Sequence, residues 1–209
     1  MFSGTTSGDE GMRAINVRRG RRLEYLTIGW NLLEGGIALG SGYVAGSISL
    51  VGFGVDSFIE SLSGGALLWR LHFDDPQRRK QAETATLKLV GLSFILLAFY
   101  VGLDAAKALI QREEPDASYV GIVLAVLTLV MMPMLAAAKR RVAVQIRSRA
   151  LIADSRQTIL CACLSAILLG GLLLNAMLGW WWADPVCALL MTPIIAREGI
   201  EALRNRACC

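Results

Sequence analysis

The chain has 209 residues, of which 55% are hydrophobic, and its mean hydropathy is +0.52. Its charged residues give a net charge of +4 and lie in clusters between long uncharged stretches. This pattern indicates an integral membrane protein and excludes a soluble helical protein, whose helices would carry charged faces. The arginines flank apolar stretches without interleaved aromatic residues, so no nucleic-acid partner is expected.

Stretches of about 20 apolar residues predict an all-α membrane protein built as a bundle of six transmembrane helices. Residues 1–22 would form a cytoplasmic N-terminal tail, 23–203 the transmembrane domain, and 204–209 a short cytoplasmic tail. Residues 1–20 are polar and glycine-rich, so a removable signal peptide is not expected. The predicted spans lie near Leu23 to Tyr43, Ser47 to Leu71, Thr84 to Ile110, Tyr119 to Ala138, Ala150 to Asn175 and Trp180 to Leu203.

The distribution of Lys and Arg predicts the orientation of these spans. Positive charges precede the first span, lie between the second and third and between the fourth and fifth, and follow the sixth. Because such clusters stay on the cytoplasmic side, both termini are predicted to be cytoplasmic in a multi-pass plasma-membrane protein. The clusters are Arg13, Arg18, Arg19, Arg21 and Arg22; Arg70, Arg78, Arg79 and Lys80; Lys139, Arg140, Arg141, Arg147 and Arg149; and Arg204 and Arg206.

Small residues recur at four-residue spacing in the first two spans, which predicts close helix packing. They are Gly36 with Gly40, Gly42 with Gly46, and Ser57 with Ser61 and Gly65.

Two acidic residues, Asp56 and Glu60, lie four residues apart in the second span. This spacing places both carboxylates on one face of a helix. An ionised carboxylate near the bilayer centre costs at least about 2.5 to 3.5 kcal/mol, so the pair needs a compensating charge. The sequence indicates no spare buried cation at that depth. A mobile metal ion or protons are therefore predicted to balance the pair.

Two polar residues of the first span, Asn31 and Glu34, are candidates for supporting roles. A helix rises about 1.5 Å per residue, which puts Glu34 near the middle of the membrane. Such residues are expected to bond the metal ligands or relay protons, and simple packing between helices is an equal alternative for Glu34.

Gln157 and Cys161 repeat the four-residue spacing in the fifth span. Facing the acid pair, they would complete a set of two carboxylates, an amide oxygen and a thiolate. Sulfur favours Zn²⁺-like or Cd²⁺-like ions over Mg²⁺ or Ca²⁺, and four such ligands allow tetrahedral coordination. The ligands must lose protons to bind metal, which gives proton antiport a chemical basis. An enzyme is not expected, because Cys161 has no nearby histidine to activate it.

Asp154 and Asp184 are the remaining acids considered for proton relay or for support of the metal ligands. Asp154 lies near the cytoplasmic end of the fifth span, where it can reach lipid headgroups or Arg156. Asp184 precedes Pro185, and this pair predicts that Asp184 caps the N-terminus of its own helix.

Three segments together resemble the cation diffusion facilitator family, which exports zinc, cadmium or iron-type cations. Residues Ser49 to Glu60 are similar to the family's second span, Ala153 to Cys161 to its fifth-span motif, and Ala183 to Leu189 to the start of its sixth span. The chain departs from the family at Gln157 and Cys161, where histidine and aspartate are usual. It also resembles a short form, without the family's cytoplasmic C-terminal domain.

The resemblance and the ligand chemistry predict a divalent metal cation transporter that exports Zn²⁺ or a similar transition metal from the cytoplasm in exchange for protons. Alternating access around a midplane site would move the ion. Homodimerisation would have to occur through the membrane helices. The alternative is a membrane-embedded metal-binding or accessory protein that does not transport.

Overall fold

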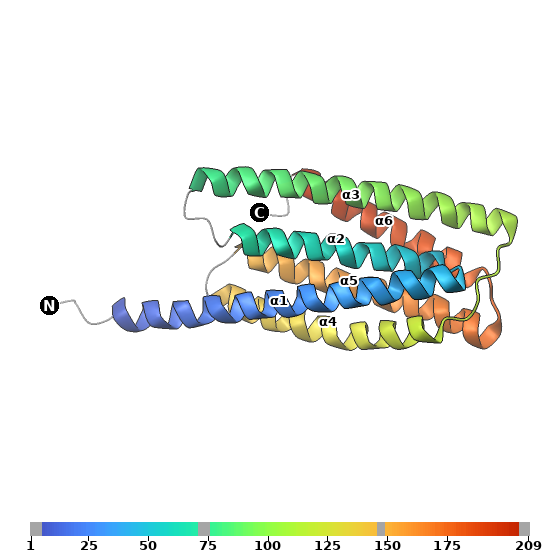
Figure 1. Ribbon diagram of the computed structural model, residues 1–209, viewed down its shortest axis with the longest axis horizontal. Helices are drawn as coiled ribbons and strands as arrows, with labels where there is room; N and C mark the ends of the chain where they lie inside the picture. The colour runs from blue at the N-terminus through green and yellow to red at the C-terminus, as the bar shows by residue number, and fades with distance from the viewer. Residues whose placement is uncertain (1–5, 71–75, 146–148, 205–209) are drawn as a thin grey trace.

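The computed structural model describes residues 6–70, 76–145 and 149–204, and these form helices joined by short connections (Figure 1). The predicted all-helical class is confirmed for this part of the chain. The first, third, fourth and fifth helices extend beyond the predicted spans, most of all at the start of the first and third helices and at the end of the fourth. They are α1 (Thr6–Ala45), α2 (Ile48–Arg70), α3 (Pro76–Gln111), α4 (Tyr119–Gln145), α5 (Arg149–Leu178) and α6 (Ala183–Leu203).

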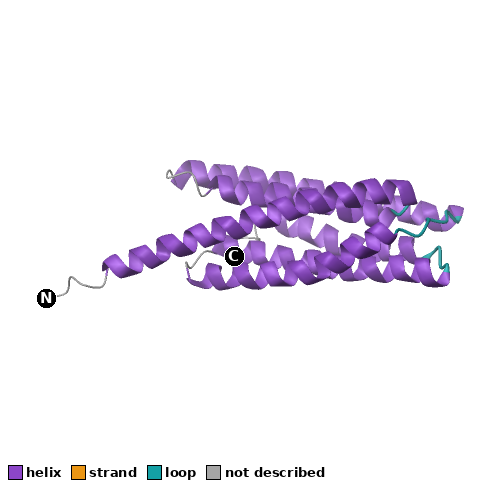
Figure 2. Cartoon of the chain, turned by 60° about the horizontal axis from the view of Figure 1, so that its bottom comes forward, coloured by secondary structure: helices purple, strands orange, loops and turns teal. Residues whose placement is uncertain are grey.

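The helices run side by side along one long axis, and α1 projects beyond the others at its N-terminal end (Figures 1 and 2). α1 packs against α2 and α4, α4 packs against α5, and α3 lies mainly along α6. The start of α1, the end of α4 and the end of α6 share one end of the bundle (Figure 1). We call it the basic end, because exposed arginines belong to these helix ends: Arg18, Arg19, Arg140, Arg141 and Arg204.

Three stretches of the described residues are long and apolar enough to cross a membrane: Lys88–Gln111, Tyr119–Gln145 and Asp154–Leu178. These belong to α3, α4 and α5. In α2, Asp56 and Glu60 interrupt an otherwise apolar stretch of the helix. Six spans and cytoplasmic termini remain predictions.

Polar and apolar side chains are distributed as expected for a protein surrounded by lipid. On α3, Leu96, Phe99 and Leu103 are each more than half exposed. In contrast, Glu34 and Lys139 are fully buried. Charged side chains inside a membrane bundle mark functional positions, because each one requires a partner or a mobile ion.

Glycines let α1 and α2 approach closely, but only some of these glycines are the predicted ones. An added Cβ at Gly54 would lie 2.9 Å from the backbone nitrogen of Leu39, and one at Gly42 would lie 2.9 Å from the nitrogen of Val51. The prediction was therefore correct for Gly42. It was wrong for Gly36, Gly40, Gly46 and Gly65, where an added Cβ would meet no atom of the described residues within 4 Å.

Candidate metal centre

Asp56, Glu60 and Cys161 are brought together inside the bundle. One carboxylate oxygen of each acid and the Cys161 sulfur all lie within 4.8 Å of one another, and all three residues are buried. The acids come from successive turns of α2 and the thiol comes from α5. Helix periodicity therefore places Asp56 and Glu60 on one face, as the sequence predicted, and the packing of α5 against α2 supplies the sulfur.

The spacing of these three atoms is close to that of a metal site. Zn²⁺ binds carboxylate oxygen at about 2.0 to 2.2 Å and thiolate sulfur at about 2.3 Å, so ligand atoms around a tetrahedral ion lie about 3.3 to 3.8 Å apart. The three groups would need to converge by roughly 1.5 Å at most, which side-chain rotation can provide. Asp56, Glu60 and Cys161 could therefore hold a divalent ion after rotation of their side chains.

Gln157, the fourth predicted ligand, lies one turn before Cys161 on α5 and lines a small pocket that also reaches Glu60. Its Oε1 accepts a hydrogen bond of 3.3 Å from the hydroxyl of Ser63. Asn31 lines the same pocket, and its Nδ2 donates a hydrogen bond of 3.0 Å to Glu60 Oε2. Asn31 thus orients a carboxylate of the cluster. Gln157 stands beside the cluster, with its oxygen held by a single weak donor.

Glu34 is buried between α1, α2 and α4 rather than in the cluster. Its carboxylate accepts a hydrogen bond of 3.4 Å from the Ser57 hydroxyl and a second one from the Thr128 hydroxyl. Ser57 follows Asp56 directly in α2. Glu34 therefore joins three helices next to the acid pair, a position that suits either helix packing or support of the site.

Asp184 does not cap its own helix, so that prediction was wrong. α6 begins at Ala183 with Trp182 as its N-cap, and the Asp184 side chain points to the N-terminus of α2 instead. Its carboxylate accepts hydrogen bonds from the backbone nitrogen of Ile48 at 3.0 Å, from the Ser47 hydroxyl at 2.6 Å, and from the Ser49 hydroxyl. A carboxylate at a helix N-terminus also interacts favourably with the helix dipole. Asp184 thereby fastens α6 to α2.

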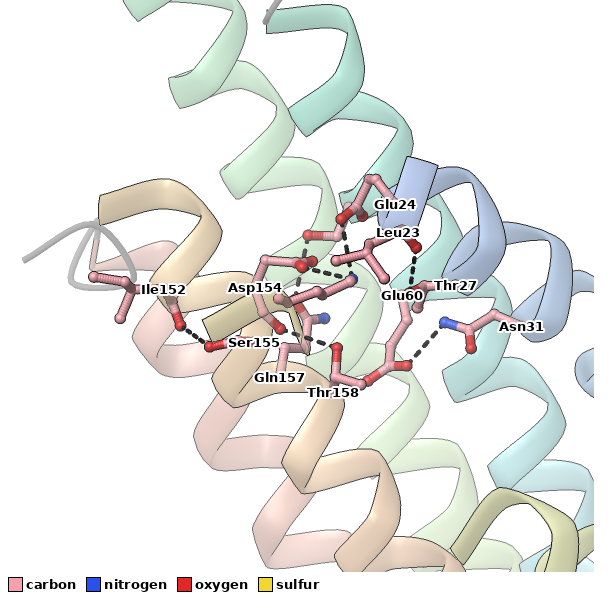
Figure 3. A network of polar contacts seen from close by, with 12 residues as sticks. Leu23, Glu24, Thr27, Asn31, Glu60, Ile152, Asp154, Ser155, Gln157 and Thr158 are labelled. Atoms are coloured by element: carbon pink, nitrogen blue, oxygen red, sulfur yellow. Dashed lines mark hydrogen bonds and ion pairs between the residues drawn. The ribbon is translucent and has the colours of Figure 1, made fainter. Parts of the chain in front are cut away.

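Asp154 belongs to a buried ion triad that the sequence did not reveal (Figure 3). The Lys139 ammonium lies 2.6 Å from Asp154 Oδ2 and 3.0 Å from Glu24 Oε2, and Lys139 is fully buried. Lys139 was predicted to lie in the basic segment between the fourth and fifth spans, and no spare buried cation was predicted at the depth of Asp56 and Glu60. α4 instead continues to Gln145 and buries Lys139.

The spacing of residues in α4 could have predicted that Lys139 is buried. Thr128, Met132, Ala136 and Lys139 follow one another at intervals of three or four residues and share the buried face of α4. A lysine that continues such a face points into the bundle, unlike its exposed neighbours Arg140 and Arg141.

The cysteines have different environments. Cys161 and Cys187 are buried free thiols, whereas Cys163 is exposed, although it lies on the same helix as Cys161. Cys208 and Cys209 lie outside the described residues.

Comparisons with known proteins agree with this arrangement. The profile of the cation efflux transmembrane domain matches residues 26–207. An uncharacterized transporter of Synechocystis sp. is 26% identical over 198 residues, which cover 91% of this chain and 64% of that protein. An uncharacterized transporter of Methanocaldococcus jannaschii is 27% identical over 183 residues, covering 84% of this chain and 64% of that protein. The chain thus spans somewhat less than two thirds of the length of both relatives.

These matches confirm the resemblance read from the second, fifth and sixth helices. The matched domain is a membrane domain and takes in most of the chain. The chain therefore belongs to the cation efflux family, whose members transport divalent metal ions.

Proposed function

We propose that this protein exports a Zn²⁺-like or Cd²⁺-like ion from the cytoplasm across the plasma membrane in exchange for protons. The observation that carries the proposal is the meeting of Asp56, Glu60 and Cys161 within 4.8 Å in the bundle interior. Two carboxylates and a thiolate bring up to three negative charges to a divalent ion, and the sulfur favours soft transition metals. Gln157 Oε1 would provide the fourth ligand once Ser63 releases it.

Proton exchange follows from the chemistry of these ligands. A carboxylate and a thiol bind metal only in their deprotonated forms, so metal binding releases protons and metal departure allows their return. The site needs no histidine for this exchange. Glu34, beside Asp56 through Ser57, would accept or supply protons as the charge of the cluster changes.

Movement of the ion requires the cluster to face each side of the membrane in turn. The ligands come from two helices, α2 and α5, so a rocking of these helices would open and close the site. The basic end would be the cytoplasmic side, since its arginines follow the positive-inside rule. A homodimer would form through exposed apolar helix surfaces within the lipid bilayer.

Purified protein in vesicles tests the proposal. Vesicles that contain a metal-sensitive dye would be given Zn²⁺, Cd²⁺ or Mn²⁺ under an imposed pH gradient, with wild type compared with Asp56→Asn and Glu201→Gln. Glu201 is the control because its side chain is 44% exposed and forms an ion pair with the exposed Arg197. We expect Zn²⁺ and Cd²⁺ flux in wild type and Glu201→Gln, and none in Asp56→Asn. Metal binding without flux in wild type would instead favour the non-transporting accessory protein.

A further inference from the structure

Two acids of the ion triad formed by Glu24, Lys139 and Asp154 line the same small pocket as one acid of the candidate metal cluster. Glu24, Asp154, Gln157 and Glu60 all line this pocket (Figure 3). Two acids that hold a lysine therefore adjoin a small cavity that also touches a carboxylate of the candidate metal site. The triad also belongs to the basic end, since Lys139 is next to Arg140 near the end of α4.

With both acids ionised, the triad holds two carboxylates and one ammonium and so carries one negative charge. Lys139 and Glu24 are at most 2% exposed, while Asp154 is 14% exposed. Buried charges are costly unless their partners match them, and a buried ion pair is in itself weak support for stability. A divalent cation between Glu24 and Asp154 would balance the two acids fully, which one ammonium cannot do.

If a metal ion replaces the Lys139 ammonium, the lysine side chain can turn toward the basic end. The next two residues of α4, Arg140 and Arg141, are exposed at the basic end. A lysine side chain has a long flexible stem and can extend along a helix until its ammonium reaches water or lipid headgroups. Rotation of this one side chain would carry its ammonium toward the basic end without a break in α4.

We propose that Lys139 is a positioning residue that acts as an internal counter-cation. An incoming divalent ion displaces its ammonium from Glu24 and Asp154 before the ion reaches Asp56, Glu60 and Cys161. Lys139 thereby sets how tightly an ion binds at the entrance of the pocket and prevents it from staying there. This inference rests on the proposed function, because it concerns the path of the transported ion.

Metal binding at the entrance can be measured without the central cluster. In an Asp56→Ala background, equilibrium dialysis against Zn²⁺ would compare chains with Lys139, Lys139→Arg, Lys139→Met, and Lys139→Met with Glu24→Gln. We expect one additional bound Zn²⁺ per chain with Lys139→Met alone. Lys139→Arg keeps the positive charge, and Glu24→Gln removes one carboxylate, so both should lack the additional ion. An equal Zn²⁺ content in all four proteins would overturn the inference, whether or not the wild type transports.

Transport kinetics separate this role from a purely structural one, in which Lys139 only holds α1, α4 and α5 together. In the otherwise wild-type chain, Lys139→Met should lower both the half-saturating Zn²⁺ concentration and the maximal flux, because the ion is held at the entrance. Lys139→Arg should restore both quantities. A purely structural role would lower the maximal flux while the half-saturating concentration stayed the same, and this result would overturn the inference.

The Lys139→Met substitution leaves two buried acids without a counter-ion, and this loss can unfold the chain. The variant is still informative in that case. Its thermal unfolding would be followed with and without Zn²⁺, again in the Asp56→Ala background. Recovery of the folded state by Zn²⁺ supports a cation position between Glu24 and Asp154. A chain that stays unfolded at saturating Zn²⁺ overturns it.

Discussion

The side-chain amide of Asn31 donates a hydrogen bond of 3.0 Å to Glu60 Oε2, and so connects α1 to the α2 part of the candidate metal cluster. Both residues are buried, and in this arrangement the Asn31 oxygen has no hydrogen-bond partner among the described residues. If the amide were flipped, its oxygen would lie next to the Glu60 carboxylate. Both groups accept hydrogen bonds and repel each other, so the flipped orientation is disfavoured. Asn31 thus holds Glu60 in a fixed orientation through its nitrogen.

Removal of this amide should weaken metal binding. Partners that orient metal ligands typically contribute about 10-fold to 100-fold in metal affinity, so Asn31→Ala should raise the dissociation constant for Zn²⁺ by that factor. Calorimetric titration of the purified protein measures it. Leu32→Ala is the control, because Leu32 is the next residue of α1 and is 48% exposed. Equal affinities in the two variants would contradict the orienting role.

Substitution of Asp184 should destabilise the fold and leave the metal cluster intact. Its carboxylate accepts several hydrogen bonds at the N-terminus of α2, and their loss in Asp184→Ala should cost about 3 kcal/mol of unfolding free energy. Denaturant unfolding measures the loss, and Asp184→Asn should recover part of it. If Asp184 relays protons instead, stability would change little and flux would fall in both variants.

Gly64 provides the space that Glu24 occupies in the ion triad. A Cβ at position 64 would lie 2.5 Å from Glu24 Oε1, whereas one at Gly65 would meet no atom within 4 Å. Gly64→Ala should therefore displace Glu24 from Lys139 and lower the thermal stability, while Gly65→Ala should not. Melting of both variants in the same detergent provides the comparison. A lower melting temperature for Gly65→Ala than for Gly64→Ala would show that this packing is misassigned.

Metal affinity should rise with pH over the range in which the ligands lose their protons. Asp56, Glu60 and Cys161 bind metal in their deprotonated forms, so a higher pH removes the protons that compete with the ion. Binding of Zn²⁺ should release protons into a weakly buffered solution, and Cys161→Ser should release fewer. Affinity that is independent of pH, with no proton release, would argue against exchange of metal for protons at these ligands.

Local periodicity was sufficient to predict the helices and the acid pair. Four-residue spacing placed Asp56 with Glu60, and Gln157 with Cys161, on shared helix faces before any fold was known. The structure then brought Cys161 to the acids, while Gln157 lies on the adjoining pocket. Such patterns depend only on helix geometry, which is why the sequence reveals them.

Contacts between distant parts of the chain were not predictable in this way. Asp184 bonds Ser47, which is 137 residues away, and nothing near Asp184 in the sequence indicates that partner. Lys139 was misread because it begins a run of basic residues, and its burial depends on how far α4 continues. Its partner Glu24 lies on a different helix, so the ion triad follows from tertiary packing alone.

The most direct test of the metal cluster is the absorption spectrum of the protein with bound Co²⁺, which replaces Zn²⁺ at sites of this kind. We predict a thiolate-to-cobalt charge-transfer band in wild type and in Cys163→Ser, because Cys163 is exposed on the same helix. Cys161→Ser should lack the band. A band of equal strength in Cys161→Ser, or none in wild type with Co²⁺ bound, would contradict the assignment of Cys161 as a ligand together with Asp56 and Glu60.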